Sequence, residues 1–159
     1  KILSSVGLVS NFEQGCNSII KTLENGHAAE IFEKMVWSLG GSANFLSKVD
    51  SLLLKAPLVE DIYPFSEGYI NSVDSRSIGL AVLALGGGRK NSNDIIDYSV
   101  GFESLLGIHD WVDSQTPLAR IHARDAKTLE LGKSIILDAY HIDQKKLGKK
   151  NPTIIEQIG

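Results

Sequence analysis

Residues 67–90 constrain the fold of this chain more than any other segment. They read EGYINSVDSRSIGLAVLALGGGRK, which contains a strand-like run, an aspartate, an apolar run, three glycines and two basic residues. Asp74 is a favourable helix N-cap, because its carboxylate can accept hydrogen bonds from the free amides of the first helical turn. Gly86 favours a helix end, because glycine adopts a left-handed backbone at little cost. We therefore predict a strand, a helix from Asp74 through Ala84, and a sharp turn in direct succession.

The predicted helix 74–84 carries apolar side chains on both of its faces. One face contains Ile78, Ala81, Val82 and Leu85, and the other contains Leu80 and Leu83. A helix that is apolar all round has to be covered on every side in a folded protein. The sequence therefore predicts that this helix is buried and that Leu83 belongs to the core.

The residues on either side of this helix favour β-structure. From Pro57 onward, β-branched and aromatic residues suit two strands that pair across a turn at residues 64–68. Further strands are expected near residues 100–106 and 118–123, a helix near residues 126–140, and a closing strand at residues 153–158. This order indicates an α+β domain that begins after Lys55.

The residues before Lys55 favour helices instead. Ser10 and Glu13 have the spacing of a capping box, in which each side chain accepts a hydrogen bond from the other residue's amide. The helix that follows has an apolar stripe consisting of Phe12, Cys16, Ile19, Ile20 and Leu23. A second helix begins near His27, and its expected buried face consists of Ala28, Ile31, Phe32, Met35, Val36 and Leu39. A short third helix is expected at residues 42–48.

Composition and charge argue against a nucleic-acid partner. With 159 residues, 43% of them hydrophobic, the chain can form a core. A formal net charge of −3 leaves no excess of positive charge to neutralise a nucleic-acid backbone, so we expect no nucleic-acid partner. The basic run at residues 145–150 is expected to be a solvated linker rather than a binding patch.

The compartment can also be inferred from the sequence. No apolar run approaches the roughly 20 residues that span a bilayer, and the N-terminus has no signal-peptide pattern, so we expect a cytoplasmic protein without a membrane partner. Cys16 is the single cysteine and has no metal-ligand spacing around it, so it is expected to be a small buried apolar residue. The chain opens on Lys1 without an initiator methionine, which suggests a fragment or a processed product.

Several motifs, taken in order, resemble the C-terminal domain of thymidine and pyrimidine-nucleoside phosphorylases. They are Gly68-Tyr69-Ile70, Asp74-Ser75-Arg76, Gly79-Leu80-Ala81, Leu85-Gly86-Gly87-Gly88-Arg89, Asp94-Ile95-Ile96-Asp97 and Val100-Gly101. The resemblance continues through residues 110–113 and 117–125, and residues 25–36 resemble the family's helix ahead of that domain. Each motif alone is common, but their order and spacing are specific. His109 departs from the family, which usually has glycine there, so either His109 adopts a positive φ or the turn differs.

This resemblance implies an α/β-hammerhead arrangement with a mixed, mainly antiparallel sheet for residues 56–159. It places residues 1–55 at the end of the family's large α/β domain. It also implies a parent transferase that converts thymidine and phosphate reversibly to thymine and 2-deoxyribose 1-phosphate. Such a parent uses no cofactor or metal, and it forms a homodimer through a domain that this chain lacks.

The resemblance also indicates where the chemistry would be. The family's Lys-His-Ser segment, its Gly-rich phosphate loop and its Ser-Lys-Lys run do not occur in this sequence. We therefore expect no catalytic residue here and no activity of the chain alone. The alternative is a stand-alone, non-catalytic binding or swivelling module.

The turn formed by Gly86, Gly87, Gly88 and Arg89 is the candidate site, and it has two interpretations. Its amides and the adjacent cations could contact an anion as a lip of the parent's active site. Alternatively, the glycines let the helix end pack closely. The turn does not have the context of a P-loop or a dinucleotide fingerprint, since a helix rather than a strand precedes it.

The histidines and tryptophans are expected to have structural or surface roles. His122 is expected to lie at the surface or to be hydrogen-bonded, and His27 and His141 are expected to cap helices or to be exposed. Trp37 and Trp111 are expected to pack with partial exposure rather than to stack on a ligand.

Overall fold

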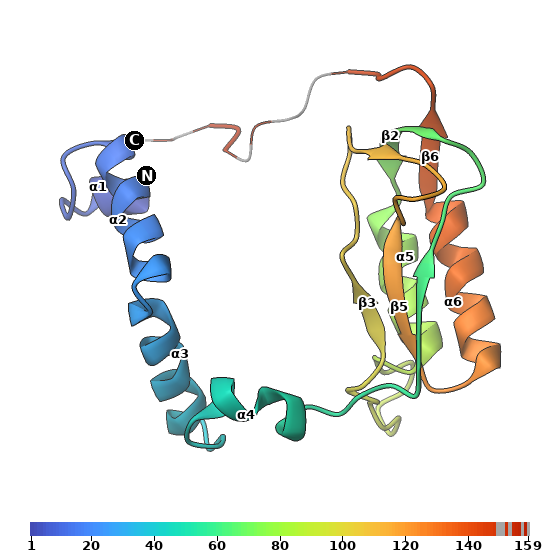
Figure 1. Ribbon diagram of the computed structural model, residues 1–159, viewed down its shortest axis with the longest axis horizontal. Helices are drawn as coiled ribbons and strands as arrows, with labels where there is room; N and C mark the ends of the chain where they lie inside the picture. Colours follow the sequence, from blue (N-terminus) through green and yellow to red (C-terminus); the bar gives the residue numbers. More distant parts are fainter. Residues whose placement is uncertain (149–151, 153, 157, 159) are drawn as a thin grey trace. The chain divides into compact units, whose positions relative to one another are not determined.

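The computed structural model describes residues 1–148, 152, 154–156 and 158 (Figure 1). The chain divides into two compact units, Lys1–Leu53 and Leu54–Gly159. The first unit is helical, and the second combines helices with antiparallel sheets, so the predicted α+β class is confirmed. That the first unit belongs to the end of a larger α/β domain remains a prediction.

The helices of the first unit begin close to the predicted positions, but their caps differ. They are α1 Ile2–Ser5, α2 Phe12–Glu24, α3 His27–Ser38 and α4 Phe45–Leu52. Asn11, rather than Ser10, is the N-cap of α2, and its Oδ1 accepts from the amide of Gln14 at 2.9 Å. Gln14 Oε1 in turn accepts from the amide of Ser10 at 2.9 Å. The predicted exchange between Ser10 and Glu13 is therefore wrong, because Gln14 takes the place of Glu13.

The apolar stripes of α2 and α3 are not buried. Phe12 is 59% exposed and Ile31 is 64% exposed. Residues 1–53 are all described, and none of their apolar side chains is buried; Cys16 is half-buried. The predicted buried faces are wrong because each helix packs mainly against its neighbour along the chain, which leaves much of each stripe uncovered. The third helix also differs from its prediction, since α4 starts and ends later than residues 42–48.

The second unit contains two small sheets and two longer helices. Its elements are β1 Leu58–Ile62, β2 Gly68–Val73, α5 Ser75–Leu85, β3 Gly101–Glu103, β4 Trp111–Val112, β5 Ala119–Ala123, α6 Ala126–Ala139 and β6 Tyr140–Asp143. The strands are ordered β1-β5-β3 in one sheet and β4-β2-β6 in the other. All the pairings between described strands are antiparallel rather than mixed.

The predicted hairpin between β1 and β2 is wrong. β1 pairs with β5, with Leu58 opposite Ala123, whereas β2 lies between β4 and β6 in the other sheet. The segment at residues 63–67 therefore connects two sheets and is not a turn within one. This arrangement buries Ile62 of β1 and Ile70 of β2 in the same core. The burial of apolar surface rather than proximity in sequence thus decides the pairing.

The predicted closing strand at residues 153–158 is not observed. Residues 154–156 and 158 lie in no strand, and residues 153 and 157 lie outside the described part of the chain. The last described strand is β6, which follows α6 directly and pairs with β2, with Ile70 opposite Ile142. The sequence analysis did not predict β6, because it assigned the start of this strand to the preceding helix.

Helix α5 begins and ends as predicted, but it is not buried on every side. Asp74 Oδ1 accepts from the amides of Arg76 at 3.0 Å and Ser77 at 3.2 Å. The helix lies beside α6 (Figure 1). Its buried residues are Ala81 and Leu85, whereas Leu80 is 50% exposed and Leu83 is half-buried.

The core lies where α5, α6 and β5 meet. Leu85 of α5, Ile121 of β5 and Ile136 of α6 are fully buried. Gly132 of α6 allows this close approach, because a Cβ there would lie 2.6 Å from Ile121 Cδ1 and 3.1 Å from Leu85 Cδ2. The missing side chain therefore sets the distance between the two helices and the sheet.

Candidate functional site

The glycine turn closes the C-terminal end of α5 in a Schellman motif. The amide of Gly86 donates to the carbonyl of Leu83 at 3.2 Å, and the amide of Gly87 donates to that of Val82 at 3.0 Å. Gly86 has the left-handed φ of 98° that this motif requires. Because these two amides satisfy carbonyls of the helix end, they are not free to hold an anion.

The next two glycines permit close packing. A Cβ on Gly87 would lie 2.9 Å from Val82 Cγ1, and one on Gly88 would lie 2.5 Å from Leu83 Cδ2. These distances are shorter than ordinary Cβ contacts, so a side chain at either position would require Val82 or Leu83 to shift. The geometry supports the structural interpretation of the three glycines, and a contact of Arg89 with substrate remains a prediction.

Two carboxylates hold the loop that follows the turn. Asp94 Oδ2 accepts from the amides of Asn91 and Lys90, both at 2.9 Å, and these hydrogen bonds lower the pKa of Asp94. Asp97 Oδ1 accepts from the hydroxyl of Ser99 at 2.6 Å and from its amide at 2.9 Å, which lowers the pKa of Asp97. Both carboxylates are therefore ionised at neutral pH and organise the loop.

An open pocket of about 280 Å³ lies beside the turn. It is lined by Leu83, Ala84, Gly86, Gly88, Lys90, Asp94, Ile95 and Arg124. Arg124 follows β5, and the Arg124 guanidinium lies 3.6 Å from the position of a Cβ at Gly86. No sequence pattern indicates a role for Arg124, because only the fold brings it to the turn. Its Nε lies 3.3 Å from Asp125 Oδ2.

The lining of this pocket has mixed charge. Lys90 and Arg124 are cationic, while Asp94 is anionic and already accepts two backbone hydrogen bonds. Such a surface can contact a charged ligand. None of the lining residues is arranged as an acid and base pair for breaking a bond.

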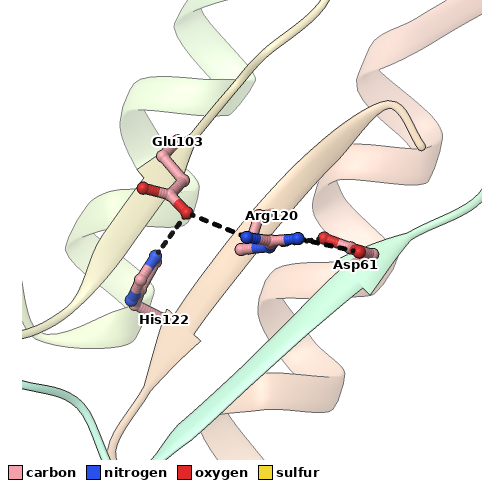
Figure 2. A network of polar contacts seen from close by, with 4 residues as sticks. All are labelled: Asp61, Glu103, Arg120 and His122. Carbon is pink, nitrogen blue, oxygen red and sulfur yellow. Dashed lines mark hydrogen bonds and ion pairs between the residues drawn. The ribbon is translucent and has the colours of Figure 1, made fainter. Parts of the chain in front are cut away.

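A second group of polar side chains lies on the outer face of the β1-β5-β3 sheet (Figure 2). Side chains alternate along β5, so the burial of Ile121 turns Arg120 and His122 to the opposite face. Arg120 Nε lies 2.6 Å from Asp61 Oδ1 on β1. Glu103 Oε1 on β3 lies 3.6 Å from Arg120 Nη1 and 3.3 Å from His122 Nε2.

This network links all three strands of the sheet. The hydrogen bond from Arg120 lowers the pKa of Asp61, so that this carboxylate remains ionised. His122 is half-buried and lies against Glu103, a neighbour that the sequence did not predict. Each charged group in the network has a partner, which indicates a structural role rather than a site that awaits a ligand.

His109 is the most unusual histidine. It has a φ of 77°, so it keeps the positive φ that glycine would adopt at this position. Its amide donates to the carbonyl of Ile70 at 2.7 Å. Its Nδ1 is buried and has no hydrogen-bond partner among the described residues. The histidine therefore fits this turn at a cost in free energy.

The remaining histidines and the tryptophans lie at the surface. His27 and His141 are exposed, as expected. Trp111 packs edge-on against Tyr69, with ring centroids 4.9 Å apart, and Trp37 is 64% exposed, so both tryptophans show the predicted partial exposure. In the described part of the chain, no group of three or more His, Cys, Asp or Glu side chains is placed to hold a metal ion. None of the described helices has the length and apolarity needed to cross a bilayer.

Comparison with known families identifies the second unit. Residues 69–143 match the family model of the pyrimidine nucleoside phosphorylase C-terminal domain. The matched segment begins in β2, includes α5, the glycine turn and α6, and ends in β6. Residues 69–143 therefore correspond to the C-terminal domain of pyrimidine nucleoside phosphorylases.

Proposed function

We propose that this chain is the C-terminal portion of a thymidine or pyrimidine-nucleoside phosphorylase, a pentosyltransferase of nucleoside salvage. The observation that carries the proposal is the family match over residues 69–143. In this reaction an oxygen of inorganic phosphate bonds to C1′ of the sugar while the bond from C1′ to the base breaks. The base leaves with the electron pair and takes up a proton. The products from thymidine are thymine and 2-deoxyribose 1-phosphate.

The catalytic groups are proposed to lie in a part of the parent protein outside this chain. The reaction needs donors for the phosphate and a proton donor for the departing base. The sequence lacks the family's Lys-His-Ser segment, and His122 is engaged with Glu103. We therefore expect the chain alone to be inactive. We expect nucleoside and phosphate to bind in a cytoplasmic parent that is a homodimer and uses no cofactor.

The turn from Gly86 to Arg89 is proposed as a lip of that active site, in addition to its role at the end of α5. Arg89 is exposed and forms no ion pair with the residues that the structure describes. Lys90 and Arg124 line the adjacent pocket. Cations at the rim of a closing site could stabilise the charge of bound phosphate.

Two assays of thymine release test the proposed reaction. The purified chain, prepared in a host without nucleoside phosphorylases, should release no thymine from thymidine and phosphate above a buffer blank. The protein encoded by the complete reading frame should release thymine in a phosphate-dependent manner. A complete protein without this activity would refute the proposal, and activity of the chain alone would refute the placement of the catalytic groups. A binding or swivelling module predicts no activity in either assay.

The lip is tested by Arg89→Ala in the complete protein. We expect kcat to fall while the melting temperature stays the same. Arg76→Ala is the matched control, because Arg76 is also exposed but lies in the first turn of α5, at the other end of the helix. If Arg89→Ala leaves the kinetics unchanged, the turn has only its structural role.

A further inference from the structure

Strand β2 has an irregularity that releases one side chain from the ladder. Its register with β6 shifts between Ile70 and Ser72, which leaves Asn71 without a partner in the ladder. A bulge of this kind changes the direction of a side chain and interrupts pairing locally. The carboxamide of Asn71 is therefore available for other contacts.

Asn71 holds the segment that follows β6. Its Nδ2 donates to the carbonyl of Lys145 at 2.9 Å, and its Oδ1 accepts from the amide of Leu147 at 2.9 Å. These two backbone groups flank Lys146, whose Nζ lies 5.5 Å from the centre of the Tyr69 ring. This distance is within the range of a cation–π interaction. One asparagine thus holds a cation over an aromatic ring.

Two further hydrogen bonds order this segment. Asp143 Oδ1 accepts from the amide of Lys145 at 2.9 Å, and Gln144 Nε2 donates to the carbonyl of Glu67 at 2.9 Å. Tyr69 also packs edge-on against Trp111 of β4, at 75° between the ring planes. Within residues 144–147, Lys146 therefore covers the ring of Tyr69 on the β4-β2-β6 sheet.

We propose that Asn71 is a latch for residues 144–147, and that opening of this latch uncovers the ring of Tyr69. The closed state depends on hydrogen bonds between exposed groups, and Leu147 itself is 49% exposed. Solvent-exposed hydrogen bonds contribute little net stability, while ordering the segment costs conformational entropy. The open state is therefore populated as a minor conformer. Asn71 decides between the open and closed states because it binds two backbone groups at once.

Trypsin provides a direct measure of the open state, because it cleaves after Lys145 and Lys146. Cleavage of a transiently opened segment follows the population of the open form when closing is fast. The intact chain should be cut more slowly at these bonds than a synthetic peptide of residues 141–150. Asn71→Ala removes both hydrogen bonds and should accelerate cleavage roughly tenfold. Asn93→Ala is the matched control, since Asn93 is an exposed asparagine in the loop between α5 and β3, and it should change nothing.

Amide hydrogen exchange, measured by NMR, supplies a second readout. In Asn71→Ala the amides of Lys145 and Leu147 should exchange faster by a similar factor, while the amides of α6 should exchange at the wild-type rate. The latch is refuted if the variant and the wild type are cleaved and exchange alike, or if the wild type is cut as fast as the peptide. Faster exchange throughout α6 would also refute it, because Asn71 would then support the whole domain.

Discussion

Replacing Gly132 and Gly79 by alanine is expected to change stability in opposite directions. Both glycines lie inside helices, where alanine is favoured over glycine by roughly 0.5–1 kcal/mol. Nothing lies within 4 Å of a Cβ at Gly79, which is exposed on α5. Gly79→Ala should therefore stabilise the protein by about that amount.

Gly132→Ala adds its methyl group to a filled core. The new Cβ would lie 2.6 Å from Ile121 Cδ1 and 3.1 Å from Leu85 Cδ2. Both neighbours are fully buried, so neither side chain has free space to move into. Overpacking of this kind costs roughly 1–3 kcal/mol, which outweighs the gain in helix propensity. We expect a net loss of about 1 kcal/mol.

Thermal melts test this, because the melting temperatures of Gly79→Ala and Gly132→Ala should differ by several degrees. Ile121→Val identifies the cause, because it removes the Cδ1 atom that the new methyl group meets. In a double-mutant cycle, Gly132→Ala should be less harmful in the Ile121→Val background than in the wild type. If Gly132→Ala raises the melting temperature as Gly79→Ala does, or if the cycle shows no coupling, the argument from close packing is wrong.

Three further substitutions test other parts of the structure by thermal melts. His109→Gly should raise the melting temperature, because it relieves the positive φ and removes the unpaired Nδ1. The free energy of unfolding should rise by on the order of 1 kcal/mol. A melting temperature below that of the wild type would show that the imidazole packs favourably. Leu85→Ala should cost roughly 2–5 kcal/mol, whereas Leu80→Ala, at a half-exposed position of the same helix, should cost much less; equal losses would contradict the observed orientation of α5. The amide and hydroxyl of Thr128 lower the pKa of Asp125 below its ordinary value of 3.8. The ionised Asp125 carboxylate therefore stabilises the folded state above pH 3.8, and this stabilisation is lost as the pH falls through the folded-state pKa. Asp125→Asn should therefore weaken the acid dependence of the melting temperature, and an unchanged dependence would assign it to other carboxylates.

The sequence by itself determined the local elements and the family. Asp74 caps α5 and Gly86 ends it because the hydrogen bonds involved join residues two to five positions apart, so both partners can be read from a short window. The helix near residues 126–140 was predicted from its periodicity, and the structure adds that Asp125 caps it through Thr128. The glycine turn was located correctly, and its order among the other motifs carried the resemblance that the family match bears out.

The tertiary structure alone decided which segments meet. β1 pairs with β5 rather than with β2, and β6 completes the second sheet, because these pairings bury apolar side chains that lie far apart in the chain. The same long-range packing brings Arg124 to the glycine turn and joins Glu103 to Arg120 and His122. Periodicity also predicted buried stripes on α2 and α3, but amphipathicity says only that a face is apolar. Whether that face is covered depends on what packs against it, and residues 1–53 bury no apolar side chain.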